Sequence, residues 1–253
     1  MRIKGIVLGC IVASSVSAGG MGPVEANNYR IVLGLLGGYA GMSAGSAQTW
    51  TANENNFIYT ANDNGGDNGF VGGFFGAETG FFHPGMIVQL GIEYDAFGTI
   101  SVQGQHFVGA DDLTYTPYEY RYTFQTQQLL GAAKLLATMY DRFHPYAAVG
   151  LGAAFNNASD FRVFTPQPDP LNIAPVYFDT NSTSFSYTLG LGVEGDITDH
   201  FRWGIGYRYS NFGTVGFGNG TVRYNNYVAI TPFNFSTSNA YANQFLAQIT
   251  YLA

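Results

Sequence analysis

Seven charged residues lie at alternate positions within apolar segments, where they could form buried ion pairs. In the stretch FRWGIGYRYSNFG, Arg202 and Arg208 alternate with Phe201 and Tyr207. Successive side chains of a β-strand point to opposite faces, so the charges would share one face with glycine and hydroxyl-bearing residues. This candidate network comprises Glu78, Glu93, Asp95, Lys134, Glu194, Arg202 and Arg208. It could serve as a gate or a proton-sensitive plug. We favour a structural role, in which it specifies one way of packing the interior.

The four histidines offer little support for enzyme chemistry. His83, His144 and His200 fall in short turns and His106 in a long loop. Nucleophilic catalysis needs a histidine within hydrogen-bond reach of a nucleophile and a group that orients the ring. Only Asp199 adjoins a histidine, in a tight turn. The sequence therefore predicts no catalytic residue, no cofactor and no metal site, since dispersed single histidines do not converge as metal ligands do.

The composition indicates a surface that does not face water alone. The chain has 253 residues, of which 11% are charged and 16% aromatic, with 34 glycines. Soluble domains carry about a quarter charged residues. No segment after the N-terminus has about 18 consecutive apolar residues, which excludes a bundle of membrane helices. The net charge of −7 argues against a nucleic-acid partner, because phosphate binding needs a basic surface.

The N-terminus has the pattern of a secretory signal peptide. A basic start, an apolar run and the small residues Val16-Ser17-Ala18 predict cleavage after Ala18. We expect 1–18 to be the signal peptide, 19–29 a periplasmic segment and 30–253 a single barrel domain. Cys10 is the only cysteine, so the mature chain would form no disulfide.

Strict alternation of apolar and small polar residues predicts eight β-strands. They cover 30–43, 69–82, 86–102, 118–138, 146–157, 183–196, 201–213 and 240–252. Short connections at 83–85, 140–145 and 197–200 alternate with long polar ones at 44–68, 103–117, 158–182 and 214–239. This alternation is typical of a meander with short periplasmic turns and long extracellular loops. An even strand number leaves both termini on the periplasmic side.

A closed barrel explains why each strand has one apolar and one polar face. In lipid every backbone polar group must be paired within the protein, so the sheet must close on itself. Apolar side chains then face lipid and the charged ones fill the lumen, where they need partners. If the turn of the sixth hairpin is 197–199, Glu194 lies opposite Arg202, and we predict an ion pair between them.

The fourth strand is ambiguous. Its tyrosines, from Tyr118 to Tyr122, have one parity, whereas Leu129 and Leu135 have the other. Either a bulge near 127–128 resets the two faces, or the membrane band begins at Leu129 and the tyrosines stand above it.

Aromatic residues cluster near the strand ends, as in the interfacial girdles of membrane proteins. We assign to this girdle Phe81, Tyr146, Phe201, Trp203, Tyr207, Tyr209 and Tyr251. Stacking on a sugar or a base is the functional alternative.

The chain resembles the small eight-stranded outer-membrane β-barrels of Gram-negative bacteria, the OmpA-like and Opa-like porin-family group. The resemblance rests on the signal peptide, the alternating segments, HPYAAVGLGAAF at 144–155 and YTLGLGVEGDITDHFRWGIGYRYSNFG at 187–213. It implies an all-β, antiparallel, up-and-down transmembrane barrel in contact with outer-membrane lipids, lipopolysaccharide and the barrel assembly machinery. Members usually end in Phe or Trp, whereas this chain ends in Tyr251-Leu252-Ala253.

Two functions follow as expectations. The first is a scaffold and surface-interaction protein whose loops bind host or cell-surface ligands, in the manner of an adhesin. The alternative is a narrow porin-like channel for small solutes or ions. A lipid-modifying enzyme is a third class, for which His106 is the only outward-facing candidate.

Overall fold

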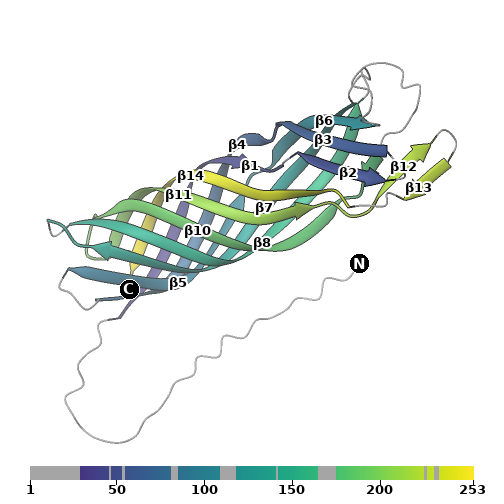
Figure 1. Cartoon of the computed structure of the whole chain (residues 1–253). Coiled ribbons are helices and arrows are strands. Elements are labelled where there is room, and N and C mark those ends of the chain that lie inside the picture. Colours follow the sequence, from purple (N-terminus) through teal and green to yellow (C-terminus); the bar gives the residue numbers. More distant parts are fainter. Residues whose placement is uncertain are drawn as a thin grey trace, which may run out of the picture.

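Eight long antiparallel strands form a closed ring in the computed structural model of the chain (Figure 1). The structure describes residues 29–45, 47–52, 55–80, 85–108, 118–140, 142–164, 175–224, 227–230 and 234–253. The ring strands are β1 (Arg30–Ser43), β4 (Gly65–Gly80), β5 (Met86–Phe97), β7 (Tyr118–Ala137), β8 (Phe143–Phe164), β10 (Thr180–Asp196), β11 (Phe201–Gly216) and β14 (Ser236–Leu252). Each pairs with the next along the chain, and β1 pairs with β14 to close the ring. The predicted eight-stranded up-and-down barrel is therefore confirmed.

The register gives the barrel a large stagger. A path that crosses each strand to the directly opposite residue starts at Leu33 and returns to β1 at Ser43, ten residues further on. It passes through Phe75, Ile92, Gly131, Leu151, Tyr187, Asn211 and Tyr241. With strands about 4.8 Å apart and a rise of about 3.3 Å per residue, this stagger tilts the strands by about 40° from the barrel axis.

A belt of apolar side chains surrounds the ring, which we call the lipid-facing belt. Every ring strand contributes at least one large apolar side chain that is 45–68% exposed. One example from each strand is Leu35, Phe75, Ile92, Leu129, Leu151, Leu191, Ile205 and Phe245. No described residue belongs to a helix long and apolar enough to cross a membrane.

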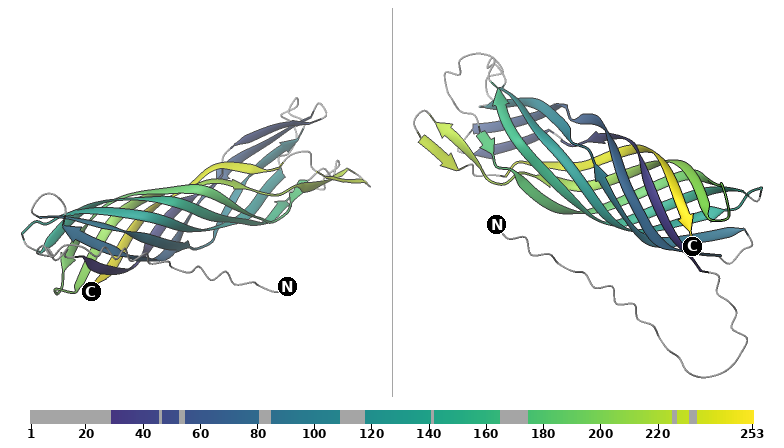
Figure 2. Two further views of the ribbon diagram at one scale, coloured as in Figure 1. Left: turned by 90° about the horizontal axis from the view of Figure 1, so that it is seen from below. Right: turned by 180° about the vertical axis from the view of Figure 1, so that it is seen from behind.

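The segments expected to be long loops are largely strands. Beyond the belt lie β2 (Gln48–Ala52), β3 (Asn55–Asp63), β6 (Ile100–Val108), β9 (Pro175–Tyr177), β12 (Gly220–Tyr224) and β13 (Tyr227–Ile230). With the outer ends of β7 and β8 they form what we call the outer extension, at the end of the barrel opposite the C-terminus (Figure 2). β2, β3 and β6 continue the main sheet, whereas β9, β12 and β13 form a separate one. The outward-facing residues of these strands are polar, which made the segments look like loops in the sequence. They are polar because the outer surface of the extension faces water and not lipid.

The side-chain chemistry of the strands inverts where the belt ends, while the alternation itself continues. In β7, Leu129 and Leu135 point outward within the belt, and Gln125 and Arg121 point outward beyond it. The inward positions change from polar to aromatic, ending with the buried Phe124, Tyr122 and Tyr120. The ladder from β7 to β5 continues without a shift through Gln127 and Gln128. The predicted bulge at 127–128 is therefore wrong, and the tyrosines stand above the membrane band.

The predicted signal peptide at 1–18 and nearly all of the segment at 19–29 lie outside the described residues, as do Phe81 and His83.

Candidate functional site

The polar interior of the ring is built from three ion-pair clusters. At the periplasmic end, where β1 begins and the C-terminus and short turns lie, Glu78 accepts hydrogen bonds from Arg202 Nη1 at 2.7 Å and Gln89 Nε2 at 2.9 Å. Arg30 is paired with the same carboxylate. Arg202 Nε donates to Asp196 Oδ1 at 2.7 Å, so this buried guanidinium lies between two carboxylates from different strands.

The predicted ion pair between Glu194 and Arg202 is wrong. Asp196 lies opposite Arg202, and Glu194 lies opposite Gly204. Ile197 N donates to the Phe201 carbonyl at 2.8 Å, so the turn comprises residues 198–200 instead of 197–199. Moving the centre of the turn by one residue shifts the pairing of the two strands by two residues. A shift of two residues preserves the alternation, so both charges still point into the lumen.

His144 continues this cluster to the end of β7. Its Nε2 lies 3.0 Å from Asp196 Oδ2 and its Nδ1 lies 3.2 Å from Thr138 Oγ1. The sequence placed His144 in a turn, whereas it is the second residue of β8 and is buried in the interior. The Thr138 hydroxyl, the imidazole and the Asp196 carboxylate thus form a chain of contacts. Because Asp196 also accepts a hydrogen bond from Arg202, this chain links the ends of neighbouring strands.

The middle cluster surrounds Lys134. Its Nζ donates to Glu194 Oε1 at 2.7 Å and to Gln248 Oε1 at 3.3 Å, and it lies 4.7 Å from the centre of the Tyr146 ring. Tyr146 was assigned to the aromatic girdle, and this assignment is wrong because the ring is buried in the lumen. Tyr146 has the same parity in β8 as His144, which also points inward.

The third cluster is centred on Arg208. Its guanidinium is paired with Glu93, donates from Nη2 to Asp95 Oδ2 at 3.0 Å, and donates from Nε to Gln244 Oε1 at 2.8 Å. Gln128 Nε2 also donates to Asp95 Oδ2, at 2.8 Å. The seven predicted network residues thus all face the interior, but they fall into three separate clusters.

A small cavity lies between these clusters of described residues. A cavity of about 40 Å³ lies among Glu93, Lys134, Tyr146, Arg208 and Gln248. At 10–15 Å³ for each water-sized sphere, it can hold about three water molecules. Asp95 Oδ1 and Glu194 Oε2 are buried and have no hydrogen-bond partner among the described residues, so ordered water in the lumen would satisfy them.

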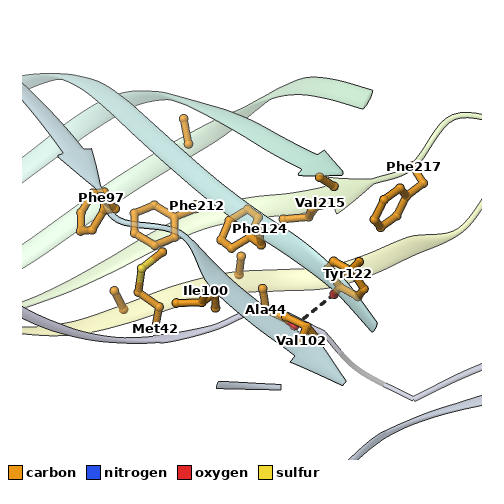
Figure 3. Close-up of a cluster of buried hydrophobic side chains, with 14 of the residues drawn as sticks. Met42, Ala44, Phe97, Ile100, Val102, Tyr122, Phe124, Phe212, Val215 and Phe217 are labelled. Carbon is orange, nitrogen blue, oxygen red and sulfur yellow. Dashed lines mark hydrogen bonds between the residues drawn. The ribbon is translucent and has the colours of Figure 1, made fainter. Parts of the chain in front are cut away.

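Beyond Arg208 the interior is filled by an aromatic core (Figure 3). The Arg208 guanidinium lies 5.3 Å from the centre of the Phe70 ring. This contact marks the boundary between the ion-pair clusters and the aromatic core. Phe97 stacks on Phe70 at 5.4 Å and meets Phe212 edge-on at 4.9 Å. Further out, Tyr122 donates from its hydroxyl to the Ala44 carbonyl at 3.2 Å. The core also contains Tyr59, Tyr120, Phe124, Phe161, Tyr177, Phe217 and Phe235.

His106 lies at the outer edge of this core. It stacks on Tyr59 with ring centres 4.3 Å apart, is fully buried, and neither ring nitrogen has a hydrogen-bond partner among the described residues. Burial lowers the pKa of this imidazole from 6.5 to about 3, because a charged ring would lose its hydration there. The expectation that His106 faces outward is wrong, since β6 directs it inward between aromatic rings.

The remaining girdle residues lie on the outer face in two groups. Phe201, Trp203 and Tyr251 are near the periplasmic end, and Tyr207 and Tyr209 are near the outer end of the belt. The Tyr207 hydroxyl donates to Asn243 Oδ1 at 2.6 Å. Tyr94 does the same to Gln127 Oε1 at 2.8 Å. Rings below and amides above mark the outer interface of the membrane.

Sequence reasoning missed the polar residues that complete the clusters and the whole aromatic core. The missed cluster residues are Arg30, Gln89, Gln128, His144, Asp196, Gln244 and Gln248. Each lies at an inward position of a ring strand, so the alternation predicts the direction of its side chain, whereas its partner depends on the register of the sheet. Within the described residues, no group of three or more histidine or acidic side chains could hold a metal ion.

The model of the outer membrane protein beta-barrel domain family matches residues 13–235. Among solved structures, Neisserial surface protein A is similar at 11% identity, covering 87% of this chain and 96% of that one, with a TM-score of 0.39. OprG from Pseudomonas aeruginosa matches at 11% identity over 88% and 95%, with a TM-score of 0.43. The protease OmpT from Escherichia coli matches at 10% over 90% and 98%, with a TM-score of 0.44. No curated protein sequence matches the chain.

Proposed function

Because the chain belongs to the outer membrane protein beta-barrel domain family and lies in the outer membrane, we propose that it is a structural scaffold with a surface for interaction outside the cell. The closed interior supports this proposal most strongly. Ion pairs fill the lumen within the lipid-facing belt, and aromatic rings fill it beyond the belt. An interior packed along its length suits a rigid support better than a conduit.

The outer extension is the part of the scaffold that would bind a partner. It is held by ladder hydrogen bonds and by a shared aromatic core, so its surface is fixed relative to the membrane. Phe164, Val176 and Phe178 lie beyond the belt and are 42–56% exposed. Apolar side chains that face water instead of lipid favour contact with another molecule. We propose that host or cell-surface ligands bind here, as for an adhesin.

Membrane lipids, lipopolysaccharide and the assembly machinery are the partners that we propose for the barrel itself. The belt and its interfacial tyrosines would contact the lipids. The barrel assembly machinery would recognise the final strand β14, with Tyr251 taking the role of the final Phe or Trp of similar barrels. Its side chain faces outward, where another protein could reach it.

A narrow channel for small solutes or ions is the alternative. Its support is the polar lining of the lumen between Glu78 and Arg208. Against it stand the 40 Å³ cavity and the aromatic core, which leave no wide path among the described residues.

We also propose that the chain is not an enzyme. Catalysis on lipids would need a histidine beside a nucleophile on the outer face. Of the three histidines that the structure describes, His106 and His144 face the interior, and His200 Nδ1 lies 2.9 Å from the Leu252 carbonyl oxygen at a turn. Unchanged lipid A after overexpression would agree with this proposal, and a new acylation pattern that depends on His144 would overturn it.

The interaction function can be tested by shortening the extension. Ser43 and Gly65 lie opposite each other, so a tight turn can replace residues 44–64 without disturbing the belt. We expect cells that display the shortened barrel to lose adhesion to host-cell surfaces, while its migration on gels still changes on heating. Thr198→Ala, in a periplasmic turn, is the control and should adhere normally. Equal adhesion of the wild-type and shortened barrels would contradict the proposal.

A further inference from the structure

A polar hollow of about 370 Å³ opens on the outward-facing wall of the outer extension. Six outward-facing side chains line it: Asp63, Gln103, Gln105, Glu119, Arg121 and Phe164. They come from four neighbouring strands and form two rows. One row runs from Asp63 through Gln103 to Arg121, and the other from Gln105 through Glu119 to Phe164. The hollow is therefore built by the register of the sheet and does not depend on a loop.

Two irregularities of the sheet flank this hollow. The pairing of β3 with β6 shifts between Ala61 and Asp63, and the pairing of β7 with β8 shifts just beyond Arg121. Asp160, at the second shift, has a φ of 55°, which is rare for a residue with a side chain. Bulges re-aim side chains and are common beside functional sites. Both shifts therefore lie where they can shape the hollow.

The polar side chains of the hollow are available for a ligand. Among the described residues, Gln103, Gln105, Glu119 and Arg121 make no side-chain hydrogen bond or ion pair with one another or with a neighbour. Two amides can donate and accept, the carboxylates of Glu119 and Asp63 accept, and the guanidinium donates. Phe164, 48% exposed, adds an apolar ring at the edge.

From this combination we propose that the hollow binds a neutral saccharide. Closely spaced hydroxyl groups need donors and acceptors side by side, and the apolar face of a sugar ring can pack on an aromatic side chain. An anionic ligand is disfavoured, because two carboxylates outnumber the single guanidinium. Arg162, opposite Arg121, lies 3.6 Å from Asp160 and is thereby partly neutralised.

The height of the hollow agrees with such a ligand. Arg121 lies six residues beyond Gln127, which marks the outer edge of the belt. At about 3.3 Å per residue and a tilt of about 40°, the hollow lies about 15 Å outside the bilayer. Its ligand would therefore be a surface glycan and not a lipid tail. This inference rests on the proposed interaction function and names the ligand class for one part of that surface.

The test uses the full chain folded in detergent micelles and an array of neutral, phosphorylated and sulfated oligosaccharides, followed by titration of the best neutral probe. We expect binding to at least one neutral oligosaccharide. Phe164→Ala and Gln105→Ala should each weaken it about tenfold or more. Gln125→Ala, an outward amide nearer the membrane on β7, is the matched control and should bind as the wild type does. Heat-modifiable migration would show that each variant is folded.

Two results would overturn the proposal. One is an absence of binding to every neutral probe. The other is binding to phosphorylated probes alone, lost in Arg121→Ala, which would make the hollow an anion site. In either case, adhesion that is still lost when residues 44–64 are replaced would leave the proposed interaction function standing.

Discussion

The part of the barrel within the lipid-facing belt and the part beyond it have opposite side-chain chemistry on the same alternating backbone. Within the belt, Ile205 points outward and Arg208 inward; beyond it, Asn211 points outward and Phe212 inward. The medium outside decides which arrangement is stable. Hydrocarbon accepts apolar side chains, so polar groups must be enclosed and paired. Water accepts polar side chains, so the aromatic rings are enclosed instead.

The largest expected effect comes from removing one partner of an ion-pair cluster within the belt. Arg208→Met leaves Glu93 and Asp95 without their shared guanidinium in a buried site. We expect a loss of about 3–5 kcal/mol in the free energy of unfolding, measured by urea titration in lipid vesicles. The variant that also carries Glu93→Gln and Asp95→Asn should recover most of this loss. If Arg208→Met is as stable as the wild type, the cluster is not enclosed.

The next effect concerns the aromatic core. Phe124→Ala removes a fully buried ring from the outer extension and should cost about 3 kcal/mol through lost packing and a residual cavity. Hydrogen exchange should accelerate in β6 and the outer end of β7, while β7 amides within the belt stay protected. Equal acceleration in both regions would mean that they unfold as one unit.

Acid should weaken the outer extension through His106. Its pKa is about 3 in the folded chain and about 6.5 when unfolded, so at intermediate pH only the unfolded form binds the proton. Above pH 6.5 the neutral His106 causes no loss of stability. Below it, the free energy of unfolding of the extension falls by about 1.4 kcal/mol for each unit of pH. At pH 5 the loss would be about 2 kcal/mol. Proteolysis of the extension at pH 7 and pH 5 measures it.

His106→Phe keeps the aromatic packing and removes the titrating group, so it is the control for this acid effect. Its extension should be cleaved at nearly the same rate at both pH values. If the variant shows the same acid sensitivity as the wild type, another group is responsible.

The smallest effect is expected at the boundary between the two regions. Tyr94→Phe removes the exposed hydrogen bond to Gln127 and should cost about 0.5 kcal/mol. Urea titration against the wild type measures it. A loss of more than about 2 kcal/mol would show that the interfacial tyrosines contribute strongly to folding stability and do not merely position the barrel in the membrane.

The alternation within the belt could be predicted from the sequence because lipid imposes a strict choice at every position. The inward direction of Glu78, Arg202 and Arg208 followed from their neighbours. The partners did not follow, since each pairing depends on where the turn is centred. The turn after β10 is displaced by one residue from the predicted position, which shifts the register by two and gives Arg202 a different carboxylate.

The aromatic core was missed for a physical reason. Tyr120 and Tyr122 alternate with charged and polar residues, a pattern that an interfacial girdle and a buried core share. The chemistry inverts beyond Gln127, and nothing in the alternation itself marks that point. Tyr146 was misplaced for a different reason: it was assigned by its position near a strand end, whereas the parity of the outward-facing Val149 and Leu151 places it inward, against Lys134.

The claim that the barrel is closed along its length is tested most directly by single-channel recording in planar lipid bilayers. The packed ion pairs and the aromatic core predict that the wild-type protein inserts and shows no discrete openings, at neutral and at acidic pH. Steady conductance steps from purified, heat-modifiable barrel would contradict the account and would favour the channel as its function.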